Sequence, residues 1–292
     1  MHIPVLTKEV KEQLNLKSGD YVIDATLDGG GHARDFLEVI EPNGKVLGIE
    51  QDEKMIDFLK SKILPAGRQA KVLESLIIAE GNFRNIKEIS KIYKFKPDAV
   101  FFDLGMSTWH LKESKRGFSF MKPEEVLSMK LSSETKISAA EILNSYSKER
   151  LAEIFKEYGE EKRAYWFAKT IVDSRKSKRI LVVDDLLNIL KVKNPKILAR
   201  IFQSLRIYIN DEINSLQKGL TEAFEILKNA GRIAVISYHS LEDREVKRFF
   251  KKIEKEKLGK TLKKPIIPQK SEIQINPSAR SAKLRVLWKI KK

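Results

Sequence analysis

The sequence of 292 residues contains no cysteine. Disulfide bridges, thiolate zinc sites and cysteine nucleophiles are therefore all excluded. The chain also lacks an apolar run of roughly 18 residues, the length that spans a bilayer. Residues 1–9 lack the apolar core of a signal peptide. We therefore expect a soluble, cytoplasmic protein with no membrane partner.

Acidic residues are scarce relative to basic ones. The chain has 40 Asp and Glu against 56 Lys and Arg, for a formal net charge of +16. Such a surplus suggests a polyanionic partner, such as nucleic acid or an acidic membrane surface, and charge alone favours nucleic acid. A basic surface without a specific partner is the alternative. The hydrophobic content of 42% suffices for one large domain or two smaller ones.

Short apolar runs, several ending in an acidic residue, alternate with helical patterns over the first 105 residues. The patterns predict strands at 21–24, 45–50, 71–79, 99–103, 232–238 and 283–290. They predict helices at 33–40, 54–63, 86–93, 138–144, 148–158, 162–174, 183–191, 195–218 and 241–257. Strands that alternate with helices indicate a parallel sheet with right-handed crossovers. The last of the predicted strands alternates like a final antiparallel strand.

The alternation of strands and helices stops between about Met106 and Gly219, where the pattern is mainly helical. We therefore expect an α/β domain formed by residues 1–106 and 220–292, with a helical domain inserted at 107–219. Residues 258–271 are rich in Lys, Gly and Pro and predict a mobile loop.

A glycine-rich loop, Asp24-Ala-Thr-Leu-Asp-Gly-Gly-Gly-His32, follows the first predicted strand. Glycine lets a ligand approach the backbone, and the next helix begins with unpaired N–H groups. The loop departs from G-x-G-x-x-G, the dinucleotide fingerprint. Asp24 suits the ammonium group of a methionine moiety better than a pyrophosphate. The loop therefore favours S-adenosylmethionine over NAD, and a plain structural turn is the remaining alternative.

Two further acids end predicted strands at the same edge of the sheet. Glu50 ends the second strand, where a carboxylate can bind both ribose hydroxyls of a nucleoside. Asp103 ends a later strand at the carboxyl edge, where open α/β sheets bind ligands. Either acid alone could be a helix cap. The glycine-rich loop, Glu50 and Asp103 together, all at the same edge of the sheet, favour a nucleoside cofactor.

Three polar segments lie further along the chain. In Ser237-Tyr-His-Ser-Leu-Glu-Asp-Arg244, His239 is either a functional group at a strand edge or the cap of the next helix. In the helix around Phe202–Glu212, Arg206 and Asn210 either bind substrate or form an ordinary solvated face. The segment 276–285 carries spaced basic residues that suit phosphate contacts.

The four histidines are His2, His32, His110 and His239. Three of them could in principle bind a metal ion. Each lies beside a feature typical of nucleotide binding instead, so we expect no metal.

Taken in order, these segments resemble the bacterial small-subunit ribosomal RNA cytidine N4-methyltransferase family over nearly the whole chain. The segments that carry the resemblance are His2-Ile-Pro-Val-Leu, Asp24-x-Thr26 with Gly30-Gly-His32, Asp103-Leu-Gly105 with Ser107, Arg116-Gly-Phe-Ser-Phe120, Tyr158-Gly-Glu-Glu161, Phe202-Gln with Arg206-Ile and Asn210-x-Glu212, His239-Ser-Leu-Glu-Asp-Arg244, and Asn276-Pro with Ala279-Arg-Ser281 before Leu284-Arg285. Each segment is a weak signal alone, whereas the ordered set is highly specific.

The resemblance implies a class I, Rossmann-like methyltransferase fold with an inserted helical domain that helps to recognise substrate. It implies N4-methylation of a cytidine in 16S ribosomal RNA near the decoding centre, with S-adenosyl-L-methionine as cofactor. Carried over by position, the implied cofactor contacts are Gly31, His32, Ala33, Glu50, Phe83, Asp103 and His110. We expect Asp103 and His239 near the target amine. The expected RNA contacts are Arg206, Asn210, Arg244 and Arg280.

The chain departs from the family pattern at five positions. Asp28 stands at a usual glycine, Ala33 at a usual serine and Glu50 at a usual aspartate. His110 stands at a usual glutamine, and Ser128 replaces an aspartate. The changes at 33 and 50 are mild if backbone and carboxylate bind the cofactor.

Two other functions remain open on the sequence. The chain could methylate DNA or protein with the same cofactor site, although the Pro-Pro pair of many DNA amino-methyltransferases is missing after Asp103. It could also be a non-catalytic RNA-binding assembly factor. Free RNA and the assembled small subunit are both possible substrates, and a homodimer is possible.

Overall fold

The computed structural model describes residues 4–63 and 75–290, which form two compact units. Unit 1 comprises the chain up to Gly105 and from Ile213 onward, and unit 2 runs from Met106 to Glu212. His2 lies outside the described residues, as does the first part of the strand predicted at 71–79. No helix in the described part of the chain is long and apolar enough to cross a membrane.

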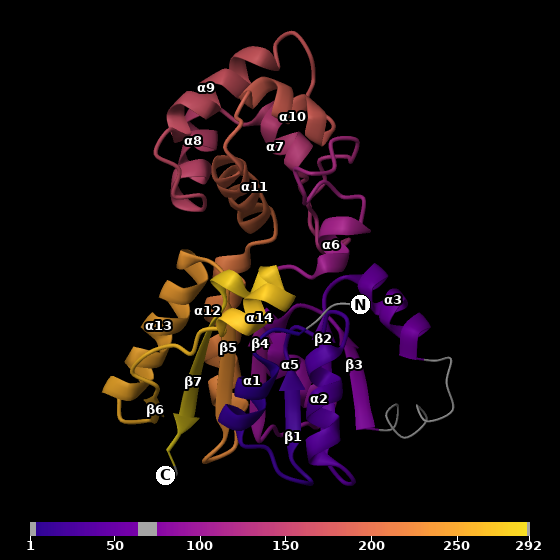
Figure 1. Ribbon diagram of the computed structural model, residues 1–292, viewed down its shortest axis with the longest axis vertical. Coiled ribbons are helices and arrows are strands. Elements are labelled where there is room, and N and C mark those ends of the chain that lie inside the picture. Colours follow the sequence, from indigo (N-terminus) through magenta and orange to yellow (C-terminus); the bar gives the residue numbers. More distant parts are fainter. Residues whose placement is uncertain (1–3, 64–74, 291–292) are drawn as a thin grey trace. The chain divides into compact units, whose positions relative to one another are not determined.

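Unit 1 is built on a seven-stranded sheet with the order β3-β2-β1-β4-β5-β7-β6 (Figure 1). The strands are β1 (Tyr21–Asp24), β2 (Lys45–Glu50), β3 (Leu76–Glu80), β4 (Ala99–Asp103), β5 (Arg232–Ser237), β6 (Gly259–Thr261) and β7 (Lys283–Lys289). Strands β1 to β5 pair in parallel, whereas β7 is antiparallel to both β5 and β6. The predicted parallel sheet with an antiparallel last strand is confirmed.

Helices cover both faces of this sheet. Unit 1 contains α1 (Thr7–Leu14), α2 (Gly31–Ile40), α3 (Glu53–Ile63), η1 (Phe83–Asn85), α5 (Ile86–Ile92), α13 (Ser240–Lys255), α14 (Lys270–Ile275), η2 (Pro277–Ser281) and nearly all of α12 (Glu212–Ile226). Successive residues of a strand point to opposite faces. Phe101 of β4 accordingly packs with α1 and α2, and Phe102 packs with α5, α12 and α13. Both faces of β4 are therefore buried.

The order of the strands reverses beside β1. The chain runs outward from β1 through β2 to β3 on one side, and then through β4 to β5 on the other. Open α/β sheets bind ligands outside the carboxyl ends of the strands at such a switch point. A ligand site is therefore expected at the carboxyl ends of β1 and β4.

Unit 2 is helical and has its own core. Its helices are α6 (Thr108–Lys112), α7 (Ala139–Ser145), α8 (Lys148–Glu157), α9 (Ala164–Ser174), α10 (Val183–Leu190) and α11 (Pro195–Ile209). Fully buried apolar side chains from α8, α9 and α11, among them Phe155, Phe167 and Leu205, form much of this core.

The single helix predicted at 195–218 is wrong, because the chain breaks it after Ile209. Asp211 has a left-handed φ of 50°, and α12 begins at Glu212. The Asn210 side chain donates to the carbonyl of Met129 and accepts from the N–H of Leu131, which fixes the turn. The two units divide at this break.

The segment 258–271, predicted as a loop, contains regular structure. Gly259–Thr261 pairs with β7 as the edge strand β6, and α14 begins at Lys270. Three residues are too few for a recognisable sequence period, so the strand depends on its partner rather than on its own pattern.

Candidate cofactor and active site

The glycine-rich loop connects β1 to α2 at the switch point. Its N–H at Leu27 donates to the carbonyl of Ile49 at 2.9 Å, which ties the loop to β2. Gly30 has a φ of +72°, a conformation that L side chains rarely adopt. Apart from its two chain neighbours, no residue comes within 4 Å of the place where a Cβ on Gly29 would be. The backbone at Gly29 is therefore open to a ligand.

Glu50, at the carboxyl end of β2, holds this loop in place. One carboxylate oxygen accepts from the N–H of Asp28 at 3.0 Å, and the other accepts from the N–H of Asp52 at 2.8 Å. The side chain is almost fully buried. Glu50 therefore orders the loop in addition to the ribose contact expected from the sequence.

Carboxyl groups that are buried or half-buried gather at this edge of the sheet. Burial raises the pKa of Asp24 well above its ordinary value, and the charges of Asp103 and Glu50 raise it further, against a hydrogen bond from Thr26. Burial also raises the pKa of Asp28, as do the carboxylates of Glu50, Asp103 and Asp24. The electrostatic environment is therefore complementary to a cation. S-adenosylmethionine, which carries a sulfonium and an ammonium group, fits both this charge and the open glycine backbone.

Asp103, at the end of β4, is held by hydrogen bonds on two sides. Its N–H donates to the Thr26 hydroxyl at 2.7 Å, and one of its carboxylate oxygens accepts from the Tyr238 hydroxyl at 2.8 Å. The other oxygen lies 3.7 Å from Nε2 of His32. Burial raises the pKa of Asp103 to about 7, although the Tyr238 hydrogen bond lowers it. Asp103 can therefore exchange a proton near neutral pH.

Tyr238 is a residue of this site that the sequence analysis missed. Burial and the Asp103 carboxylate raise the pKa of Tyr238, so its hydroxyl stays protonated and donates. A Cβ on Gly105 would lie 3.2 Å from the Tyr238 ring, so glycine leaves room for the ring at this point. The one sequence feature that could have indicated its role is its position directly before His239.

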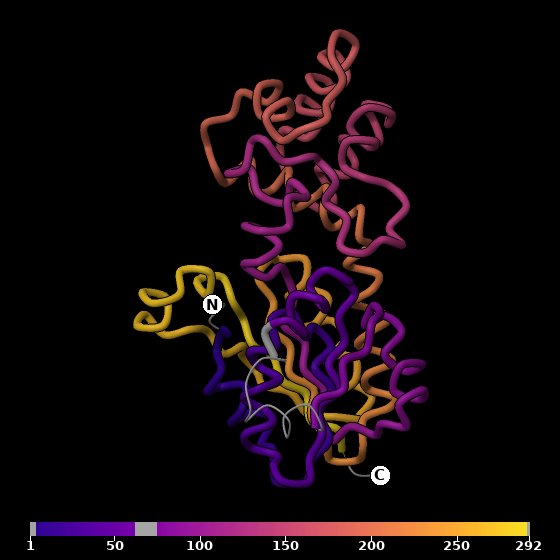
Figure 2. Tube along the Cα trace, turned by 90° about the vertical axis from the view of Figure 1, so that its right-hand side faces the viewer, coloured from indigo at the N-terminus to yellow at the C-terminus, as the bar shows by residue number. Residues whose placement is uncertain are grey.

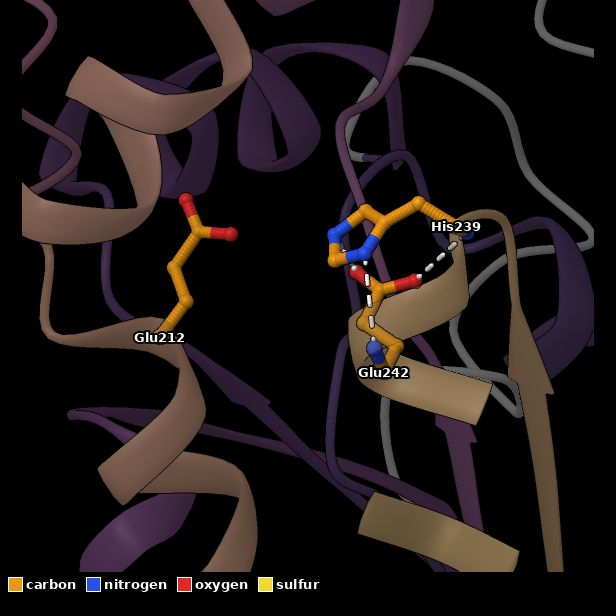
Figure 3. A group of neighbouring side chains, drawn as sticks. All are labelled: Glu212, His239 and Glu242. Carbon is orange, nitrogen blue, oxygen red and sulfur yellow. Dashed lines mark hydrogen bonds and ion pairs between the residues drawn. The ribbon is translucent and has the colours of Figure 1, made fainter. Parts of the chain in front are cut away.

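His239 caps α13, as shown in Figure 3. Its Nδ1 accepts from the N–H of Glu242 at 3.3 Å, and its Nε2 lies 3.0 Å from a Glu242 carboxylate oxygen. The Glu242 carboxylate accepts in return from the N–H groups of Tyr238 and His239. The helix-cap alternative is thus realised, and the role of His239 at the target amine stays a prediction. Glu212, also drawn there, is the last residue of unit 2.

The other residues expected at the cofactor have different surroundings. Ala33 is buried in the first turn of α2. Phe83 follows the carboxyl end of β3 and packs edge-on against Phe102, with ring centroids 5.6 Å apart. His110 belongs to unit 2, where its Nδ1 lies 2.8 Å from the Ser107 hydroxyl.

The four residues expected to bind RNA fall into two classes. Arg206 and Asn210 are engaged within unit 2. Two guanidinium nitrogens of Arg206 donate to Glu212 at 2.8 and 2.9 Å, and Asn210 is 9% exposed. Buried polar groups with such partners usually hold the fold. Arg244 and Arg280 are exposed on unit 1.

The N-terminal segment lies against the glycine loop and is held by the C-terminal part of the chain. A Cβ on Gly31 would lie 2.5 Å from the Pro4 ring. Two residues on, the N–H of Leu6 donates to the Glu272 carboxylate of α14 at 2.7 Å. Figure 2 shows the indigo N-terminal segment beside the yellow segment that contains α14. Glu272 therefore holds the segment whose Pro4 packs against Gly31.

We expect Glu272→Leu to weaken cofactor binding by about 1.5 kcal/mol, or roughly tenfold, because one charge-assisted hydrogen bond is lost. Calorimetric titration with S-adenosylmethionine measures the change. Glu272→Gln keeps an acceptor for the Leu6 N–H and should bind nearly as well as the parent chain. Equal affinities for the Leu and Gln variants would contradict this role.

Comparison with known proteins places these features in a family. The family model described as the MraW methylase family matches residues 1–290. "Ribosomal RNA small subunit methyltransferase H" of Dictyoglomus turgidum is 41% identical over 98% of this chain and 96% of its own length. The protein of the same name from Carboxydothermus hydrogenoformans is 37% identical over 99% and 98%.

A solved structure supports the fold. The crystal structure of a methylase from Clostridium thermocellum covers 99% of this chain and 100% of its own, with a TM-score of 0.50 and 15% identity. At this identity the likeness concerns the fold alone, and that fold is the class I methyltransferase fold expected from the sequence. The cofactor of this class is S-adenosyl-L-methionine. With a family model that matches nearly the whole chain, this protein belongs to the MraW methylase family.

Proposed function

We propose that the chain transfers a methyl group from S-adenosylmethionine to N4 of a cytidine in 16S ribosomal RNA near the decoding centre. The names of the relatives support a ribosomal RNA substrate, and such a substrate would place the protein in the cytoplasm. The observation that carries the proposal is the Asp103 carboxyl, only 11% exposed, with its Tyr238 partner, beside a carboxyl-lined glycine loop.

The cofactor supplies an electrophilic methyl group when it is bound. The exocyclic amine of cytidine is a weak nucleophile because its lone pair is delocalised into the ring. An acceptor on the amine N–H would hold the amine in the attacking orientation and take up its proton. Asp103 can serve as this acceptor, because Tyr238 fixes one of its oxygens and its pKa is near neutrality.

Glu50 and the open backbone at Gly29 would hold the cofactor on the loop side. We propose that the inserted helical unit helps to recognise the RNA. The exposed Arg244 and Arg280 are our candidates for contacts with RNA phosphates.

Methyl transfer is expected to become faster as the pH rises through about 7. Only the deprotonated Asp103 accepts a proton, and burial raises its pKa to about 7. In a plot of kcat/KM for the cofactor against pH, the rising limb reports the pKa of the free protein. This limb should lie near pH 7. A bound cation favours the carboxylate, so the limb of kcat should lie at lower pH.

The control for this pH profile is Tyr238→Phe. It removes a hydrogen bond that lowers the pKa of Asp103, so the limb of kcat/KM should move to higher pH. A rate that falls as the pH rises through neutrality, or a limb unmoved by Tyr238→Phe, would speak against Asp103 as the acceptor.

The substrate class is tested by transfer of a tritiated methyl group. Small ribosomal subunits, naked 16S RNA, DNA and protein are each offered with labelled cofactor. Label in RNA supports the proposal, and label only in DNA or protein rejects it. Binding to RNA without transfer would identify a non-catalytic assembly factor instead.

A further inference from the structure

We propose that a pocket between α9 and α10 binds one nucleotide of a single-stranded segment of the RNA substrate. The base would stack on Trp166, and the flanking phosphates would contact Arg179 and Lys191. The inference rests on the proposed function, since it assumes an RNA substrate. It assigns a nucleotide site within unit 2 alone.

The pocket has a volume of about 440 Å³. Trp166, Thr170 and Ser174 line one wall, and they are spaced by four residues along one face of α9. Asn188 of α10 also lines the pocket. Hydroxyl and amide groups beside an aromatic ring suit the polar edge and the flat face of a base.

Trp166 is half exposed, at 50%, although it is a large apolar residue. It is nevertheless held in place. The Arg163 guanidinium lies over its ring at 4.9 Å from the centroid, and the Phe167 ring packs edge-on at 5.0 Å. An ordered aromatic ring in contact with water is a suitable platform for an unpaired base.

The charges around the pocket favour a polyanion. Residues 162–193 contain nine Lys and Arg but only three Asp. Of these acids, Asp185 lines the pocket. Its carboxylate accepts from Lys178 at 2.6 Å and from the N–H of Leu181 at 2.9 Å, so it is engaged by the protein itself.

Arg179 and Lys191 are exposed and line the pocket, where they can contact phosphate. A basic rim beside an aromatic ring fits single-stranded RNA. A basic ribosomal protein would meet repulsion at the same surface.

The stacking contact is tested with Trp166→Ala in methyl transfer to small subunits and to naked 16S RNA. We expect KM for RNA to rise about tenfold with kcat nearly unchanged, since stacking contributes about 1–3 kcal/mol per base. Trp166→Tyr should restore most of the affinity. The matched control is Tyr165→Ala, because Tyr165 is adjacent and 55% exposed but does not line the pocket.

The phosphate contacts are tested with the double variant Arg179→Gln and Lys191→Gln. Log affinity falls as log salt rises, and this slope should become shallower by about 1.4, because each contact with a single strand contributes about 0.7. The control removes two exposed lysines elsewhere in unit 2, with Lys136→Gln and Lys156→Gln. It should change the slope less.

The possible outcomes separate this inference from the proposed function. A parent chain that transfers no label to RNA rejects the proposed function. A parent chain that methylates RNA, with the same KM for Trp166→Ala and Tyr165→Ala, rejects only the pocket. A loss seen with subunits but not with naked RNA would assign the pocket to a ribosomal protein and overturn the nucleotide site.

Discussion

Asp103→Asn is expected to lower kcat for methyl transfer by at least about 100-fold, the smallest factor usual for general acid–base catalysis. Asparagine keeps the size of the side chain and one oxygen that can accept from Tyr238, but it cannot take up a proton. Single-turnover transfer to small ribosomal subunits measures the effect. Cofactor affinity should change much less than kcat, because Glu50 and the loop backbone remain.

Two controls accompany the Asp103 variant. Asp57→Asn changes an exposed aspartate on α3 and should leave kcat unaltered. The thermal stability of Asp103→Asn should equal or exceed that of the parent chain at pH above 7. Burial raises the pKa of Asp103, so its ionisation opposes folding there, and the neutral amide removes that penalty. A kcat within a few-fold of the parent value would remove Asp103 from the chemistry.

Glu50→Ala is expected to weaken cofactor binding by about 100-fold or more. Two backbone N–H groups, of Asp28 and Asp52, lose a charged acceptor, and each such hydrogen bond is worth about 1.5–3 kcal/mol. The expected contact with the ribose is lost as well. Calorimetric titration with S-adenosylmethionine measures the change.

Glu50→Gln separates the two roles of Glu50. It keeps one acceptor oxygen for the loop and should have an intermediate affinity. Glu41→Ala, which changes an exposed glutamate at the end of α2, is the control. An affinity for Glu50→Ala within threefold of the parent value would contradict both the loop-ordering and the ribose role.

Much of the sheet could be predicted because buried parallel strands are nearly continuous apolar runs. Ala99–Asp103 and Arg232–Ser237 are such runs. The last residue of each run lies at the carboxyl edge of the sheet, so the sequence alone indicates which residues lie there. The glycine loop was recognisable for the same reason, since it directly follows β1.

Long-range contacts account for what the sequence did not reveal. Tyr238 reaches Asp103 across 135 positions of the chain, and Glu272 reaches Leu6 across 266. The spacing of residues along one helix or strand does not reveal contacts between positions so far apart in the chain. Asn210 was expected within one continuous helix, whereas its amide fixes the turn at the end of α11. Its contact with RNA stays a prediction. The substrate was inferred from the ordered motifs, and no single residue of the site identifies it.

The central claim, N4-methylation of a cytidine in small-subunit RNA, is tested most directly by the modified nucleoside itself. Small subunits that lack the modification are incubated with the parent chain and S-adenosylmethionine, and their RNA is digested to nucleosides for mass spectrometry with fragmentation of the base. We predict one new N4-methylcytidine per subunit with the parent chain, and very little with Asp103→Asn over the same time. A methyl group on C5 of cytosine, on another base or on ribose, or no new methylated nucleoside, would contradict the account.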